Sequence, residues 1–172
     1  MKKTKRVVFC GILSALAVLF LYGAGVLPTG RIALYCLASC LTAVTCIECG
    51  WKYALAGFAA ASALALILVP DKLSVLPYCL FLGYYPVLKE RIEAWGRLGR
   101  EWIVKMILFF AVSAAAVAGA LALLGNGSLP LSPVLLAAAG GIVLAIFDFA
   151  MSLFIQFYRE RIAKLIRNGD KL

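Results

Sequence analysis

The chain has 172 residues, of which 65% are hydrophobic, and its mean hydropathy is +1.01. Soluble domains are roughly 45–50% apolar, so a soluble fold of this length could not bury so much apolar surface. The net charge of +9 comes from 17 basic and 8 acidic residues, which lie between the apolar runs. Composition therefore predicts a membrane protein and argues against nucleic-acid binding.

Six apolar runs are separated by charged or turn-forming stretches. They predict an all-α, polytopic membrane protein built as a six-transmembrane-helix bundle. In chain order the predicted spans are Val7–Leu27, Ile32–Ile47, Tyr53–Val69, Leu73–Tyr85, Trp102–Leu124 and Leu131–Tyr158. We expect a single domain over residues 1–172, with a short basic N-terminus at residues 1–6 and a basic tail at residues 159–172.

The fourth predicted span breaks at Gly83-Tyr84-Tyr85-Pro86 and restarts as an amphipathic helix. Pro86 has no backbone N–H and biases the residue before it away from helical angles, so Tyr85 should be non-helical or kinked. Proline also suits the first position of a new helix. That helix is expected to lie along the cytoplasmic membrane surface. The residues that share its apolar face are Val87, Leu88, Ile92 and Trp95.

Lys and Arg divide unequally between the two sides of this topology. Fifteen of the 17 fall on one side, and Arg31 and Lys72 fall on the other. Because cytoplasmic loops carry an excess of Lys and Arg, we expect a multi-pass protein of the cell membrane with both termini in the cytoplasm.

Asp148 lies well inside the sixth predicted span. A carboxylate there costs about 2.5–3.5 kcal/mol on insertion scales, so it should face the bundle interior and take a partner. The stripe of small and polar residues on its helix comprises Gly141, Ala145, Asp148 and Ser152. Its candidate partners are Lys105, Lys89 and Tyr84. Both a role in binding a ligand or ion and a structural hydrogen bond between spans fit this residue.

Tyr84, Tyr85 and Lys89 stand together at the break. Irregular backbone at membrane depth is tolerated where it lines a cavity, so two phenols and an ammonium could bind a polar ligand there. The alternative is interfacial anchoring, because Tyr favours the headgroup zone and Lys extends toward it.

Six cysteines fall in or beside apolar segments, which argues against a secreted disulfide framework. Cys46-x-x-Cys49 could be a redox or metal pair, but the chain has no histidine and no second Cys-x-x-Cys to complete a zinc site. We interpret the cysteines as small apolar residues. No catalytic constellation and no phosphate loop are present in the sequence, so we expect neither enzymatic activity nor a cofactor.

Two pairs of small residues, Gly11-x-x-x-Ala15 and Ala115-x-x-x-Gly119, would let helix backbones approach closely. Each could contact a partner subunit or pack within the chain.

A basic amino end, six short spans, both ends inside and small residues in the first span resemble the substrate-binding (S) components of energy-coupling factor transporters. The run Gly83-Tyr-Tyr-Pro-Val-Leu-Lys-Glu-Arg-Ile-Glu also resembles membrane proteins of Firmicutes-type bacteria. In S components, small residues of the first span contact a transmembrane coupling subunit that works with ATPase subunits. Gly11 and Ala15 occupy the matching places. The substrate lies toward the outer side, under a loop that is short here, around Pro28 to Arg31.

The resemblance implies a membrane-embedded binding subunit for a small, vitamin-like nutrient in a bacterial plasma membrane. The ligand-binding candidates are Asp148, Tyr84, Tyr85 and Lys89, and the partner-binding candidates are Gly11 and Ala15. Two other functions fit the sequence. One is a structural or regulatory membrane protein with no transported ligand, and the other is a small ion-coupled carrier that would need Asp148 to titrate. The expected partners are membrane lipid and the coupling subunit, with no nucleic acid.

Overall fold

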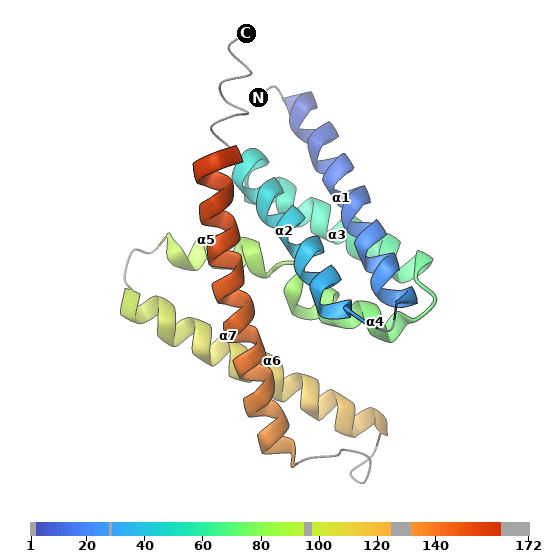
Figure 1. Cartoon of the computed structure of the whole chain (residues 1–172), viewed down its shortest axis with the longest axis vertical. Coiled ribbons are helices and arrows are strands. Elements are labelled where there is room, and N and C mark those ends of the chain that lie inside the picture. The colour runs from blue at the N-terminus through green and yellow to red at the C-terminus, as the bar shows by residue number, and fades with distance from the viewer. Residues whose placement is uncertain (1–2, 28, 95–97, 125–131, 163–172) are drawn as a thin grey trace. The chain divides into compact units, whose positions relative to one another are not determined.

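The structure is a computed structural model that describes residues 3–27, 29–94, 98–124 and 132–162. The described part is helical and contains no strand (Figure 1). The elements are α1 (Lys3–Val26), α2 (Arg31–Cys49), α3 (Trp51–Leu68), α4 (Lys72–Pro77), η1 (Tyr78–Leu82), α5 (Tyr85–Glu93), α6 (Leu98–Leu124), α7 (Pro133–Phe157) and η2 (Tyr158–Ile162). The elements η1 and η2 are π-helical turns. The all-α class is confirmed.

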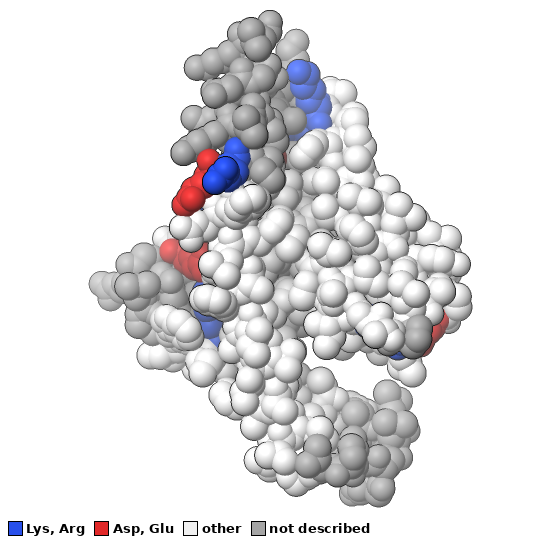
Figure 2. Space-filling view, in the orientation of Figure 1, with Lys and Arg blue, Asp and Glu red and all other residues white. Residues whose placement is uncertain are grey.

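Among the described residues, five helical stretches are long and apolar enough to cross a membrane, as a multi-pass membrane protein requires. They are α1, α2, α3, Trp102–Gly119 within α6 and Val134–Arg161 across α7 and η2. Many large apolar side chains on them point outward, such as Ile67, which is 75% exposed. On the face shown in Figure 2, most of the described surface carries no charge, and the charged side chains gather in a few places.

The chain divides into two compact units. The first comprises residues 1–91 and 153–172, and the second comprises residues 92–152. The single domain that the sequence predicts for residues 1–172 stays a prediction.

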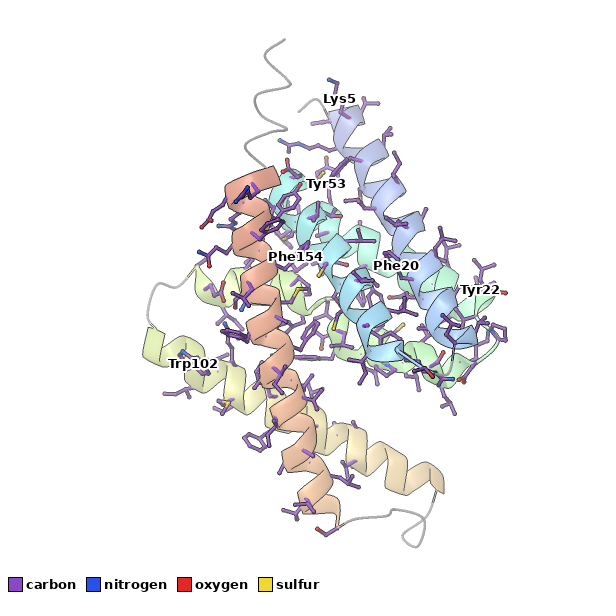
Figure 3. The ribbon with its side chains drawn as sticks, viewed as in Figure 1. Lys5, Phe20, Tyr22, Tyr53, Trp102 and Phe154 are labelled. Carbon is purple, nitrogen blue, oxygen red and sulfur yellow. The ribbon has the colours of Figure 1, made fainter. Side chains whose placement is uncertain are left out.

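In the first unit, α1, α2 and α3 pack around a core in which small side chains are common. The core includes Ala17, Ala24, Ala38, Ala61 and Ala65 with the larger Leu21, Val69, Val75 and Tyr78. Gly57 on α3 explains one close approach, because a Cβ there would lie 2.8 Å from Ser14 Oγ and 2.9 Å from Cys10 Sγ. Small residues therefore bring α1 and α3 together. Tyr22, by contrast, points away from this core (Figure 3).

The fourth predicted span, Leu73–Tyr85, is not one continuous helix. It is formed by α4, with six residues, and η1, with five. At 1.5 Å per residue they extend about 16 Å, roughly half of the hydrocarbon thickness of a bilayer. Pro77 ends α4, and the π-helical turn that follows places a hydrogen bond from Gly83 N to Tyr78 O at 2.8 Å.

The predicted break is confirmed, but it lies one residue earlier than expected. Gly83 and Tyr84 form the turn, and Tyr85 is already the first residue of α5. Tyr85 is therefore helical, contrary to one form of the expectation, but it directly follows the break, as the other form required. The carbonyl of Tyr84 accepts hydrogen bonds from Val87 N at 3.1 Å and Leu88 N at 3.2 Å. Pro86 thus falls in the first turn of α5, where a backbone N–H has no intrahelical partner, and its missing donor costs nothing there.

The face expected to be apolar on this helix is buried at Val87 and Ile92 and partly buried at Leu88. Trp95 lies outside the described residues. That α5 lies at the membrane interface stays a prediction.

In the second unit, α6 and α7 approach each other closely at Ser113. Its hydroxyl donates to the carbonyl of Ala137 at 2.7 Å. A Cβ added to Gly140 would overlap Ser113 Oγ and lie 3.2 Å from Ser113 Cβ, so glycine lets the two helices approach at this crossing.

Candidate functional site

Asp148 lies on α7 and pairs with Lys105 of α6. The distance from Lys105 Nζ to Asp148 Oδ2 is 3.4 Å, and both side chains are nearly buried. Lys105 Nζ also lies 2.8 Å from Glu93 Oε1 at the end of α5. One ammonium therefore serves two carboxylates within the second unit. The expectation that Asp148 turns inward and bonds a polar group of the fourth or fifth span is confirmed for Lys105.

Glu93 is the member of this cluster that the sequence did not reveal. It lies 12 residues before Lys105, across a stretch that includes residues 95–97, which the structure does not describe. Glu93 lies on α5 and Lys105 on α6, so the three- or four-residue spacing of contacts within one helix could not predict this pair. The stripe on α7 is placed as expected, with Gly141 and Asp148 buried and Ala145 and Ser152 partly buried.

Tyr84, Tyr85 and Lys89 belong to the first unit, whereas Asp148 belongs to the second. Tyr84 is partly buried and packs edge-on against the ring of Phe58, with centroids 5.8 Å apart. Tyr85 is fully buried, and its ring lies 4.9 Å from that of Phe81. Lys89 is 1% exposed, which does not fit a lysine that extends to the membrane surface. A ligand-binding role for these residues stays a prediction.

A row of polar side chains on α2 forms the most continuous polar feature of the first unit. Its members are Tyr35, Ser39, Thr42 and Cys46, which we call the polar row. Their spacing of four, three and four residues places them on one face of the helix. This spacing is visible in the sequence and is sufficient to predict the row.

Every member of the polar row contacts the interrupted segment formed by α4, η1 and α5. The hydroxyl of Tyr35 donates to the carbonyl of Ser74, and that of Ser39 donates to the carbonyl of Leu82 at 2.7 Å. Thr42 Oγ1 lies 3.3 Å from the hydroxyl of Tyr78, and Cys46 Sγ lies 2.6 Å from Glu90 Oε2. The row therefore follows this segment from near its start to near its end.

Two of these bonds satisfy carbonyls that the interruptions leave without a helical donor. In a continuous helix the carbonyl of Leu82 would accept from the N–H of residue 86, but residue 86 is a proline. Ser39 supplies the donor instead. In a regular helix the carbonyl of Ser74 would accept a hydrogen bond from Tyr78 N, but Tyr78 N donates to the carbonyl of Val75 instead. The hydroxyl of Tyr35 donates to the carbonyl of Ser74. Hydroxyl groups on a neighbouring helix are a known means of tolerating a broken helix in a membrane.

A small cavity lies beside the polar row, between α1, α2, α3 and η1. Its volume is about 10 Å³, which is room for about one water molecule. Hydroxyl groups of Ser14, Thr42, Thr45 and Tyr78 contribute to its lining, together with the ring of Phe58 and the alanines of α1 and α3.

A second polar cluster joins the last turn of α2 to α5 and to η2. Glu90 lies 3.6 Å from Arg159 Nη2, and Glu48 Oε1 accepts from the hydroxyl of Tyr158 at 3.1 Å. Cys49 Sγ lies 3.7 Å from the carbonyl of Arg6, whereas the Cys46 thiol contacts Glu90. The two thiols of Cys46-x-x-Cys49 thus take different partners.

Gly11 and Ala15, the expected partner-binding residues, both lie on the exposed face of α1. A Cβ added to Gly11 would meet no atom within 4 Å. Ala115 and Gly119 are likewise exposed on α6. These positions are not used for packing within the described part of the chain, but that alone does not identify a partner.

Comparison with protein-family models, with curated proteins and with solved structures finds no match to this chain.

Proposed function

We propose that this chain is the membrane-embedded binding subunit of a small-nutrient uptake transporter of the energy-coupling factor type. The observation that carries the proposal is the placement of Gly11 and Ala15 on an outward face of α1, with open space beside Gly11. A binding subunit of this type needs a lipid-facing surface on which a coupling subunit can dock at close range. Small residues on that surface permit such an approach.

We further infer that the chain crosses the membrane six times and that α4, η1 and α5 together make an interrupted fourth crossing. This proposal replaces the expectation that the crossing ends at Tyr85 and that α5 lies along the membrane surface. Asp71, just before α4, pairs with Arg31 at the start of α2, at 3.5 Å. Near the end of α5, Glu90 contacts Cys46 in the last turn of α2. The interrupted segment therefore covers the length of α2. In this topology both termini lie in the cytoplasm and the end of α5 lies near the cytoplasmic interface.

The docking surface is tested by replacing Gly11 or Ala15 with leucine and co-purifying the chain with an energy-coupling factor module, made of its coupling subunit and ATPase subunits. We expect each leucine to abolish co-purification, because its side chain would hold the partner helix away. The chain should stay folded, since nothing lies within 4 Å of a Cβ at Gly11.

Gly119→Leu is the matched control. Gly119 is also a helical glycine with nothing within 4 Å of an added Cβ, but it lies on α6. It should co-purify as the parent does. If the parent binds the module and the α1 variants bind it equally well, docking through α1 is wrong.

A structural membrane protein with no transported ligand is the second candidate. The small volume of the described cavity favours it, because pockets for small molecules measure roughly 300–1,000 Å³ and this one measures about 10 Å³. Under that alternative the parent chain should show no co-purification with the ATPase module and support no uptake of a nutrient into vesicles.

A further inference from the structure

We infer that the cavity between α1, α2, α3 and η1 is a binding site for one water molecule, which joins the hydroxyls beside the polar row to the π-helical turn. Two observations define the site. Its volume of about 10 Å³ matches a single water. Its lining also brings together the hydroxyls of Ser14 on α1, Thr42 and Thr45 on α2, and Tyr78 on η1.

The hydroxyls at this site offer more acceptors than donors. Each hydroxyl carries one hydrogen and two lone pairs. The hydrogen of Thr45 is already donated to the carbonyl of Leu41, at 2.9 Å. Thr42 can donate its hydrogen to the carbonyl of Ala38, at 3.5 Å. One hydrogen then lies between the oxygens of Thr42 and Tyr78, which are 3.3 Å apart. Lone pairs are therefore left over, and a water molecule brings two hydrogens to them.

The balance of donors and acceptors also bears on the strength of the Thr42–Tyr78 contact. A separation of 3.3 Å is long for a hydrogen bond between two hydroxyls, which is usually about 2.7–2.8 Å. A water that bonds both oxygens would satisfy them without bringing α2 and η1 closer together. The water thus allows the π-helical turn to stand slightly apart from α2 while its polar groups stay satisfied.

Oxygen lone pairs would also attract a monovalent cation, but the lining favours water. The residues that line the cavity carry no charge, and four of them are alanine or glycine. A bare cation there would lose its hydration with no carboxylate to offset the cost. A neutral water needs only two to four polar partners, which this lining supplies.

The test is a structure of the full chain in lipid nanodiscs at a resolution that shows ordered waters, combined with NMR. We expect one density peak within hydrogen-bonding distance of Thr42 and Tyr78, and magnetisation transfer between a long-lived water and the methyl groups of Thr42 and Thr45. Replacing both threonines with valine keeps their shape but removes their hydroxyls. The water peak should be lost in that variant.

Tyr35→Phe is the control, because Tyr35 donates to Ser74 and does not line the cavity. It should keep the water signal. The measurement on the parent protein tests the inference even if the double valine variant does not fold. The absence of a long-lived water in the parent would overturn the inference, and so would a shift of the Thr42 and Thr45 signals when sodium is exchanged for choline.

Discussion

Lys105 is the residue on which the buried charges of the second unit depend. Replacing it with methionine leaves the Asp148 carboxylate without this ammonium in a nearly buried place. Removing one partner of a buried ion pair costs about 3–5 kcal/mol of unfolding free energy. The side chain of Glu93 is 40% exposed. Solvent screens its ion pair with Lys105, so losing that pair adds little to the drop in unfolding free energy.

Asp148→Asn should be much milder than Lys105→Met. Asparagine keeps the size of the side chain and a carbonyl acceptor, and Lys105 keeps its contact with Glu93. We expect a cost of about 1 kcal/mol, close to that of one hydrogen bond. Denaturant unfolding of the purified variants in detergent measures both values. Equal losses for the two variants would show that the contact with Glu93 does not compensate Lys105 for the loss of Asp148.

The same pair of variants separates structure from transport at this residue. If Asp148 only holds α6 and α7 together, the asparagine variant should keep the activity of the parent. If it binds a cation or relays a proton, the variant should fold and lose transport.

At the scale of elements, the interrupted segment depends on hydroxyls from α2. Ser39→Ala should leave the carbonyl of Leu82 without a donor, because Pro86 cannot supply one. An unsatisfied buried acceptor costs about 1–3 kcal/mol. The unfolding free energy of this variant in detergent should fall by that amount.

Ser113→Ala is a closely matched control for Ser39→Ala. Both serines are buried, and each hydroxyl lies 2.7 Å from a carbonyl on another element. Ser39 Oγ also lies 2.9 Å from the carbonyl of Tyr35 on its own helix, so its one hydrogen is shared between two acceptors. The Ala137 carbonyl lies inside the continuous helix α7, where the N–H of Gly141 can still donate to it. The unfolding free energy of Ser113→Ala should therefore fall by only about 0.5–1.5 kcal/mol, the net value of one hydrogen bond. A larger loss at Ser113 than at Ser39 would contradict the role given to Pro86.

Hydropathy was sufficient to predict the five long helices, because an apolar run of about 20 residues has few alternatives to a membrane helix. The break near Pro86 was also predictable, since it depends on the covalent geometry of proline. Three features were not predictable. The burial of Lys89 and the contact of Glu93 with Lys105 depend on how separate segments meet. The π-helical turn after Pro77 depends on which carbonyls α2 can cap, and that too is settled only by packing.

At the scale of the whole molecule, the two basic residues that depart from the charge asymmetry have local structural roles. Lys72 caps the end of α3, donating to the carbonyls of Leu66, of Ile67 at 3.2 Å and of Val69 at 2.9 Å. Arg31 donates to the carbonyl of Leu27 after α1, at 3.3 Å, and pairs with Asp71. Cations near helix C-termini satisfy carbonyls and oppose the helix dipole. Both exceptions therefore have a reason that is independent of membrane orientation.

The distribution of all 17 basic residues supports the proposed six crossings over five. With an interrupted fourth crossing, fifteen basic residues share one side and two lie on the other. If α4, η1 and α5 did not cross, the chain would cross five times. The four basic residues of the N-terminus and Lys52 would then lie on one side of the membrane, and the other twelve basic residues would lie on the opposite side. The positive-inside rule strongly favours the first arrangement.

Reporter fusions at the two termini distinguish the two topologies. Six crossings place the N-terminus and the C-terminus on the same, cytoplasmic side, and a reporter inserted at Asn126 on the opposite side. Five crossings place the two termini on opposite sides. Arg31→Gln and Lys72→Gln should leave the reporter pattern unchanged, because these residues cap helices. Termini found on opposite sides would show that the interrupted segment does not cross, and the six-crossing arrangement would then be wrong.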